Sequence, residues 1–368
     1  MRLSLTLSLY IGRQFLLHIG ITLSLLVMLV WIVDSVELIK RTSGKEGATI
    51  LLALEMALLK TPYMASRILP FAILIGSMSA LTRLTKSHEL IIARAAGVSV
   101  WQFLAPALMV VVSIALLFLA VMNPISAVSL LRFEKLEARY IAGQTSLLTL
   151  SNTGLWLRQQ EKQQGSLKEY VIHAKRISQT DMTFKQVMIL TYGPDDKFIE
   201  RFDAAETSLR DGELILNDVV YSVPGKPAVP LSRHSIATNL QIEQIQDSFT
   251  SPETMPFWNL PGFIDTLEEA GFSALKHKIY WHSLLASPLL FVGMVLLAAV
   301  FSLRLPRRGK IALLVLAGGA SGFALHFMTD LVHALGGAGS LPIWLAGWTP
   351  SLIIISLASA ALLHTEDG

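Results

Sequence analysis

The stretch WQFLAPALMVVVSIALLFLAVM, residues 101–122, contains no charged side chain. A helix needs about 20 mostly apolar residues to cross the hydrocarbon core of a bilayer, so this stretch predicts a transmembrane helix. The composition agrees, because 52% of the 368 residues are hydrophobic and only 15% are charged. Soluble domains carry roughly 25% charged residues. The chain is therefore predicted to be a membrane protein.

Five further segments resemble this one in length and apolar character. Together, the six predicted transmembrane spans are residues 15–33, 63–84, 101–122, 283–303, 311–332 and 341–363. Arg2 and Arg13 flank the start of the chain, but no small-residue cleavage site follows the first span. We therefore expect a retained first helix rather than a signal peptide.

The distribution of basic residues predicts the orientation in the membrane. Cytoplasmic loops of membrane proteins carry an excess of Lys and Arg. An inside N-terminus places these residues in the cytoplasm: Arg2, Arg13, Arg83, Lys86, Arg94, Arg304, Arg307, Arg308 and Lys310. The short loop between the fifth and sixth spans has no Lys or Arg, and the first outer loop offsets its basic residues with acidic ones. Both termini are therefore predicted to be cytoplasmic. The net charge of +3 fits this pattern and does not suggest a nucleic-acid partner.

The composition changes between the third and fourth spans. Hydropathy falls, and short alternating runs at 155–157, 170–173, 187–190 and 214–216 predict strands. Turn signals at 192–196, 210–213 and 224–227 separate them. Strands without intervening helices favour a sandwich or jelly-roll. Residues 126–140 are expected to continue the third helix out of the membrane, and residues 261–270 to form an interfacial helix.

The predicted fold is an α-helical membrane protein of six transmembrane helices with an inserted periplasmic β-jelly-roll-like domain. The expected divisions are residues 1–124 for the first three spans, 125–262 for the β-rich domain and 263–368 for the last three spans. The chain has no cysteine, which excludes disulfides and thiolate metal sites.

A cytoplasmic segment at 82–100 predicts a short amphipathic helix. Ser87 is a candidate N-cap, Glu89 falls in the first turn, and Gly97 is expected to end the helix. Its apolar face comprises Leu90, Ile91, Ala95 and Ala96. Such a helix can lie flat on the membrane or dock into the groove of a partner, and its spacing favours neither.

Two other motifs in the spans have structural explanations. Gly318, Gly319 and Gly322 lie within an apolar span and predict close helix packing rather than nucleotide binding. The chain also lacks the GxxxxGK[ST] loop that binds ATP phosphates.

His326, Asp330 and His333 are spaced to lie on one helix face. Three such ligands without further support are weak evidence for a metal, so we predict no metal site and a packing or hydrogen-bonding role for His326 and Asp330.

The segment SHELIIARAAG, residues 87–97, resembles the coupling helix of the LptF/LptG (YjgP/YjgQ) lipopolysaccharide-export permease family. Glu89 matches the acidic position of the family motif and Gly97 its closing glycine. The segment AGQTSLLTLSNTGLW, residues 142–156, resembles the start of the periplasmic domain of LptG. Six spans with an insertion after the third are also the plan of this family, and the second segment makes LptG the closer member.

The resemblance implies a function. Family members pair as an LptF–LptG heterodimer on two copies of the ATPase LptB, in the bacterial inner membrane. The pair pushes lipopolysaccharide toward LptC and the LptA bridge. ATP is then bound by the partner ATPase, and this chain is a transporter subunit without a cofactor or a catalytic site of its own. The implied ATPase-coupling residues span 86–97 and are Glu89, Leu90, Ile91, Arg94 and Gly97.

Lipopolysaccharide is anionic, so basic residues are expected near the outer mouth of the cavity. The candidate substrate-binding residues are Lys40, Arg41, Arg67, Arg132, Lys135 and Arg139. Arg67 is the strongest because an ionisable residue within a span is a functional candidate by default. Lys40, Arg41 and Arg139 also fit interfacial anchoring by snorkelling, and Arg67 itself lies close enough to the interface to snorkel. Where the family leads us to expect a lysine inside the first helix, this sequence has Trp31.

Three alternatives differ from an export permease. A membrane-anchored periplasmic adaptor or sensor would leave six spans unexplained. An intramembrane enzyme built on His326 and Asp330 would lack a clear nucleophile–base pair, since Ser321 and Thr329 have no motif context. Another ABC permease of the mechanotransmission type would usually have four spans.

Overall fold

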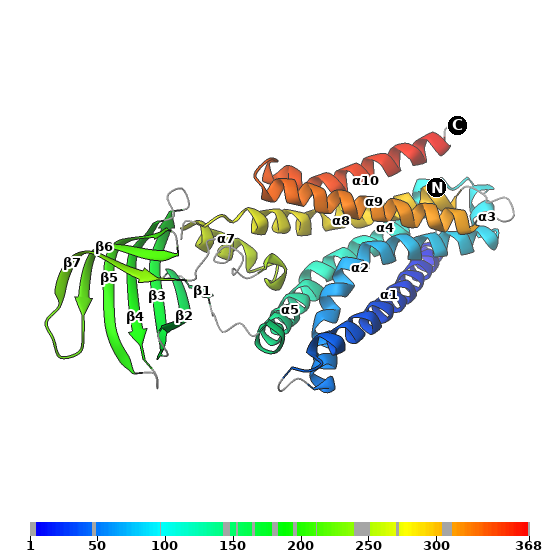
Figure 1. Ribbon diagram of the computed structural model, residues 1–368. Helices are drawn as coiled ribbons and strands as arrows, with labels where there is room; N and C mark the ends of the chain where they lie inside the picture. The colour runs from blue at the N-terminus through cyan, green and yellow to red at the C-terminus, as the bar shows by residue number, and fades with distance from the viewer. Residues whose placement is uncertain are drawn as a thin grey trace. The chain divides into compact units, whose positions relative to one another are not determined.

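The computed structural model describes residues 5–45, 49–95, 97–142, 148–151, 154–163, 166–178, 183–193, 197–210, 212–238, 251–269, 272–303 and 311–366. The chain divides into two compact units, which we treat separately (Figure 1). The helical unit comprises Met1–Leu136, Glu253–Trp258 and Leu275–Gly368, and the β unit comprises Glu137–Pro252 and Asn259–Ala274. The basic residues expected at 304–310 lie outside the described residues.

The helical unit is built from long helices. Its elements are α1 (Leu5–Thr42), α2 (Ile50–Lys86), α3 (Glu89–Ala95), α4 (Val100–Leu117), the π-helical turn η1 (Phe118–Met122), α5 (Asn123–Glu137), α8 (Leu275–Ser302), α9 (Ile311–Gly337) and α10 (Ile343–Glu366). In the described part of the chain, five helices are long and apolar enough to cross a membrane. The fifth predicted span is present as α9, whose 27 residues are also of spanning length. The chain is a multi-pass membrane protein.

Three helices extend well beyond the predicted spans. α1 has 38 residues and α2 has 37, so each is about 55 Å long at 1.5 Å per residue. The chain from Val100 to Ile141 is helical over 42 residues, as the predicted continuation of the third helix requires. A hydrocarbon core is only about 30 Å thick. Much of the expected first outer loop is therefore helix, and Lys40, Arg41 and Lys60 lie on helices rather than in a loop.

The helices pack through small residues. A Cβ built on Gly76 of α2 would lie 2.6 Å from Cα of Ile19 in α1, so only glycine allows this backbone approach. Gly318 and Gly322 of α9 pack against side chains of α2, those of Met78 and Phe71, rather than against its backbone, which confirms the predicted packing role for these two. Gly319 faces open space, so the prediction is wrong for that residue, because it lies on another face of α9.

Asn123, the residue after the π-helical turn, forms hydrogen bonds to two other segments of the helical unit. Its side chain is buried, at 2% exposed. Its Oδ1 accepts a hydrogen bond from the backbone N–H of Phe257 at 2.8 Å, and its Nδ2 donates to the Tyr280 hydroxyl at 3.3 Å. Asn123 thereby ties α5 to α8 and to the segment Glu253–Trp258 of the helical unit.

The β unit contains one antiparallel sheet of seven described strands in the order β1-β2-β3-β4-β5-β6-β7. The strands are β1 (Leu148–Ser151), β2 (Gly154–Gln163), β3 (Ser166–Ser178), β4 (Thr183–Tyr192), β5 (Phe198–Arg210), β6 (Glu213–Ser222) and β7 (Val229–Ala237). Consecutive strands are paired, so the described part of the sheet is an up-and-down meander. The β-rich insertion and all four predicted strands are confirmed, and β1, β5 and β7 are additional.

Alternation along the strands places the core on one face of the sheet. Tyr170, Ile172 and Ala174 of β3 are buried in turn, as side chains two residues apart share a face. Ile189 of β4 and Leu216 of β6, on either side of β5, are completely buried. Gly225 takes a positive φ of 77°, which confirms the turn predicted at 224–227, and Gly212 takes 79° within the turn predicted at 210–213, of which Asp211 lies outside the described residues. Part of the turn at 192–196 lies outside the described residues. The unit also contains the short helices η2 (Ala138–Ala142), η4 (Pro252–Thr254, shared with the helical unit) and α7 (Leu260–Glu269).

Candidate functional site

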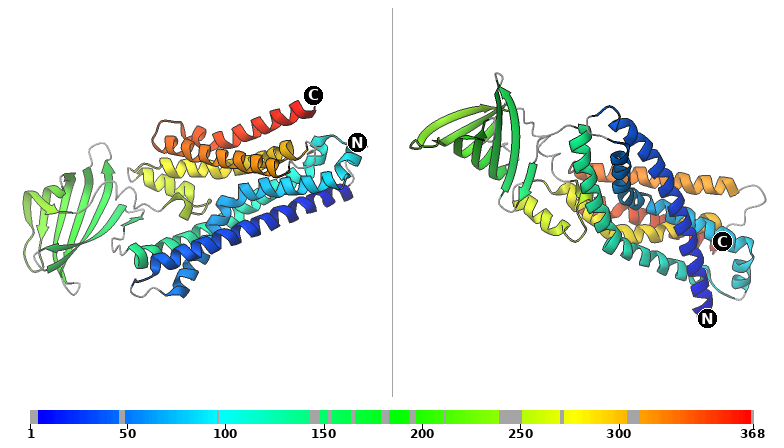
Figure 2. Two further views of the ribbon diagram at one scale, coloured as in Figure 1. Left: turned by 45° about the vertical axis from the view of Figure 1, so that its right-hand side comes forward. Right: turned by 90° about the horizontal axis from the view of Figure 1, so that it is seen from below.

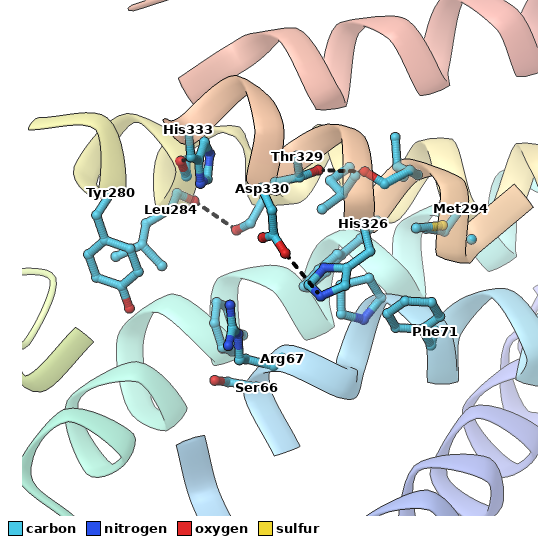
Figure 3. Close-up of a pocket in the computed structure, with 18 of the residues that line it drawn as sticks. Ser66, Arg67, Phe71, Tyr280, Leu284, Met294, His326, Thr329, Asp330 and His333 are labelled. Atoms are coloured by element: carbon cyan, nitrogen blue, oxygen red, sulfur yellow. Dashed lines mark hydrogen bonds and ion pairs between the residues drawn. The ribbon is translucent and has the colours of Figure 1, made fainter. Parts of the chain in front are cut away.

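A pocket of about 210 Å³ opens in the helical unit between α2, α8 and α9 (Figure 3). Phe71, Phe118, Leu284, Phe291, Met294 and Leu325 give it an apolar lining. A second group of lining residues is polar: Tyr63, Ser66, Arg67, Glu253, Tyr280, Ser283, Asp330 and His333. The pocket thus offers a long apolar molecule both a hydrocarbon surface and hydrogen-bonding groups.

Arg67 is the cation of this pocket. It lies between Pro62 and Pro70 of α2, and its Cζ is 5.7 Å from the ring centre of Tyr63. Figure 3 shows it across the pocket from Asp330 and His326 of α9. No carboxylate of the described residues lies within ion-pair distance of its guanidinium. The five N–H donors of Arg67 are thus available to an anionic ligand.

The polar residues of α9 contact one another and α8. His326 Nε2 lies 3.6 Å from Asp330 Oδ2, and its ring meets that of Phe71 edge-on at 5.9 Å. His333 Nε2 lies 3.0 Å from the Ser283 hydroxyl of α8. His326 and Asp330 lie next to each other on one face of α9, and His333 contacts Ser283 of α8. The described residues contain no group of three or more such side chains placed to hold a metal ion.

The remaining candidate cations lie on the long helices. Lys40 and Arg41 are in the last turn of α1, and Arg132 and Lys135 are on α5. All four are exposed. Arg139 belongs to the β unit, where its Cζ lies 5.4 Å from the ring centre of Tyr140. Within the helical unit, no described contact joins Lys40, Arg41, Arg132 or Lys135 to Arg67, so the structure does not gather these five candidates into one site.

Lys60 links the ends of three helices. Its Nζ on α2 lies 3.2 Å from Asp34 Oδ1 on α1 and 5.7 Å from the Phe133 ring centre on α5. The lysine and aspartate side chains are only 20% and 14% exposed. The sequence indicated only a basic residue in an outer loop, because nothing in the spacing of Asp34 and Lys60 marks them as partners.

α3 follows α2 directly and has one inward and one outward side. Leu90 is 3% exposed, whereas Ile91 and Ile92 are 42% and 67% exposed. Gly97 has φ of 83°, its N–H donates to the Arg94 carbonyl at 2.9 Å, and the Val98 N–H donates to the Ala93 carbonyl at 3.1 Å. Gly97 therefore ends the helix as predicted. Ser87 is the C-cap of α2, so its prediction as the N-cap of α3 is wrong. The chain reverses at His88, whose φ is 62°.

The start of α1, the end of α10 and α3 lie at the same end of the helical unit (Figures 1 and 2). The last turn of α1, with Lys40 and Arg41, lies at the opposite end. The start of α1 and the end of α10 can lie on one side of a membrane only if the chain crosses it an even number of times. The fold and its two ends define a multi-pass membrane protein with a short helix exposed beside both termini.

Comparison with known families identifies the class. The family described as "Lipopolysaccharide export system permease LptF/LptG" matches residues 9–364. The chain therefore belongs to the LptF/LptG family and is a lipopolysaccharide export permease. The family covers both proteins, so the closer resemblance to LptG stays a prediction. No individual curated protein matches the chain.

Proposed function

We propose that this chain is one permease subunit of an ABC transporter that extracts lipopolysaccharide from the bacterial inner membrane. ATP is hydrolysed by a separate LptB-like ATPase dimer, and a second, LptF-like permease completes the cavity. The observation that carries the proposal is the family match together with α3, whose exposed Ile91 and Ile92 form an apolar surface beside the chain termini. An ATPase needs such a surface in order to move helices that contain no nucleotide site.

The orientation follows from the same proposal. α3 and both termini are cytoplasmic, and the β unit is periplasmic, where it passes lipopolysaccharide to LptC and the LptA bridge. The coupling surface consists of Glu89, Leu90, Ile91, Arg94 and the turn at Gly97. Leu90 anchors it because this side chain is buried, and the exposed members meet the ATPase. The divisions at 1–124, 125–262 and 263–368 describe the corresponding membrane, periplasmic and membrane parts.

The substrate path begins at the pocket of α2, α8 and α9. Arg67 is proposed to bind a phosphate of lipopolysaccharide, since its guanidinium has no carboxylate partner among the described residues and lies beside an apolar lining. Lys40, Arg41, Arg132, Lys135 and Arg139 are proposed to contact the anionic substrate beyond the membrane. Asp330 Oδ2 lies 3.6 Å from His326 Nε2 on the opposite wall of the pocket.

Two experiments test these assignments. Purification of the tagged chain from its native membrane should recover a soluble ATPase in stoichiometric amount, and recovery of the chain without one would contradict the transporter assignment.

A photo-crosslinker at position 67 should capture radiolabelled lipopolysaccharide. The same group at Leu357, an exposed α10 residue away from the pocket, is the matched control. Equal capture at both positions would remove Arg67 from the substrate path.

A further inference from the structure

The carboxylate of Glu89 is held through one of its two oxygens. Glu89 Oε1 accepts a hydrogen bond from the Ser87 hydroxyl at 2.8 Å and another from the Tyr10 hydroxyl at 3.2 Å. No described residue donates to Oε2 at hydrogen-bonding distance. Hydrogen bonds to an ionised acceptor are the stronger class, so the two donors restrict the rotamer of this side chain.

The two donors come from different helices. Ser87 caps the end of α2, two residues before α3 begins. Tyr10 lies 79 residues earlier in the chain, on the first turns of α1. The turn at His88 and the buried side chain of Leu90 fix the backbone of α3 between them. Glu89 therefore contacts a residue of α1 and the C-cap of α2 before any partner binds.

We propose that Tyr10 and Ser87 are positioning residues that pre-organise the Glu89 carboxylate for its contact with the ATPase. This inference rests on the proposed function, because it assumes that an ATPase binds α3. Pre-organisation increases affinity by removing the cost of ordering a flexible side chain on binding. The exposed side chains of Ile91 and Ile92 supply the apolar part of the same interface.

The test measures the affinity of the ATPase for the permease pair in lipid nanodiscs, with ATP hydrolysis as the signal. Tyr10→Phe and Ser87→Ala each remove one hydroxyl and keep the rest of the side chain. Each should raise the apparent Kd about threefold, the effect of one modest hydrogen bond. Tyr221→Phe is the matched control, because it removes a tyrosine–glutamate hydrogen bond of 3.0 Å in the β unit.

A second measurement separates positioning from helix packing. In a Glu89→Ala background, Ile91 and Ile92 still dock, and Tyr10→Phe should cause no further change in Kd because its acceptor is gone. An unchanged Kd for Tyr10→Phe in the native background would overturn the inference. An equal rise in both backgrounds would overturn it too, since Tyr10 would then act through α1 alone. A native Kd for Glu89→Ala would instead contradict the proposed function.

Discussion

The contact between Gly76 and Ile19 makes a sharp prediction about the stability of the α1–α2 pair. In Gly76→Ala, the new Cβ would lie 2.6 Å from Cα and 2.9 Å from N of Ile19. Carbon atoms pack best at about 3.5–4.0 Å, so one helix must move by roughly 1 Å. Both opposing atoms belong to the backbone, so no side chain can rotate away.

The magnitude follows from two opposing terms. Overpacking costs about 1–3 kcal/mol, and a backbone clash belongs at the upper end of that range. Alanine regains about 1 kcal/mol over glycine in a helix. We expect a net loss of about 2 kcal/mol in the free energy of unfolding. The hydrogen bond of 2.9 Å between His18 and Ser79, on the same interface, should weaken with it.

The assay is reversible unfolding in mixed micelles, followed by far-UV circular dichroism. Gly20→Ala is the matched control, because it makes the same change in α1, one residue from Ile19, where a Cβ meets nothing within 4 Å. That variant should be as stable as the native chain or more stable by up to about 1 kcal/mol. If Gly76→Ala is as stable as Gly20→Ala, the reasoning about close helix approach is refuted.

Two further predictions concern charged and ionisable groups. Asp34→Asn should lower the free energy of unfolding of the helical unit by about 1–2 kcal/mol, because it leaves the partly buried ammonium of Lys60 without its carboxylate. A double variant with lysine at position 34 and aspartate at position 60 should recover part of that loss. Equal free energies of unfolding for the double and the single variant would argue against the ion pair. In the β unit, the hydrogen bond to Glu200 raises the pKa of the Tyr221 phenol. The contribution of this hydrogen bond to stability should therefore be complete below about pH 10, the ordinary pKa of tyrosine, and should be lost as the pH rises through the pKa of the folded state. Spectrophotometric titration of the native chain minus Tyr221→Phe reports that ionisation, and a midpoint at or below the ordinary value for tyrosine would contradict the assignment.

Hydropathy predicted where the chain crosses the membrane but not where its helices end. It detects apolar residues, whereas α1 and α2 continue through Glu37, Lys40 and Glu55, which favour helix without being apolar. Composition also failed to predict β5, because its acidic and alanine residues are uncommon in strands. Its buried Phe202 and Ala204 alternate correctly, but neighbouring strands are needed to make that pattern meaningful.

Local motifs were predictable when their chemistry lies within a few residues. Gly97 ends α3 because a positive φ is required there, and the sequence alone indicates such a residue. Contacts between distant helices were not predictable. Neither the pairing of Asp34 with Lys60 nor that of Tyr10 with Glu89 has a local signature. The prediction of Ser87 as the N-cap of α3 was wrong for a related reason, because a serine between two helices can cap either one.

The most direct test of the coupling role is ATP-driven transfer of lipopolysaccharide from proteoliposomes by the complex containing Glu89→Ala. The substitution removes the half-buried carboxylate of Glu89 and leaves the buried side chain of Leu90 in place. The variant should insert and pair normally, yet hydrolyse ATP with weakened coupling and export less lipopolysaccharide than the native complex. Native rates of transfer by Glu89→Ala would contradict the claim that an ATPase drives this permease through α3.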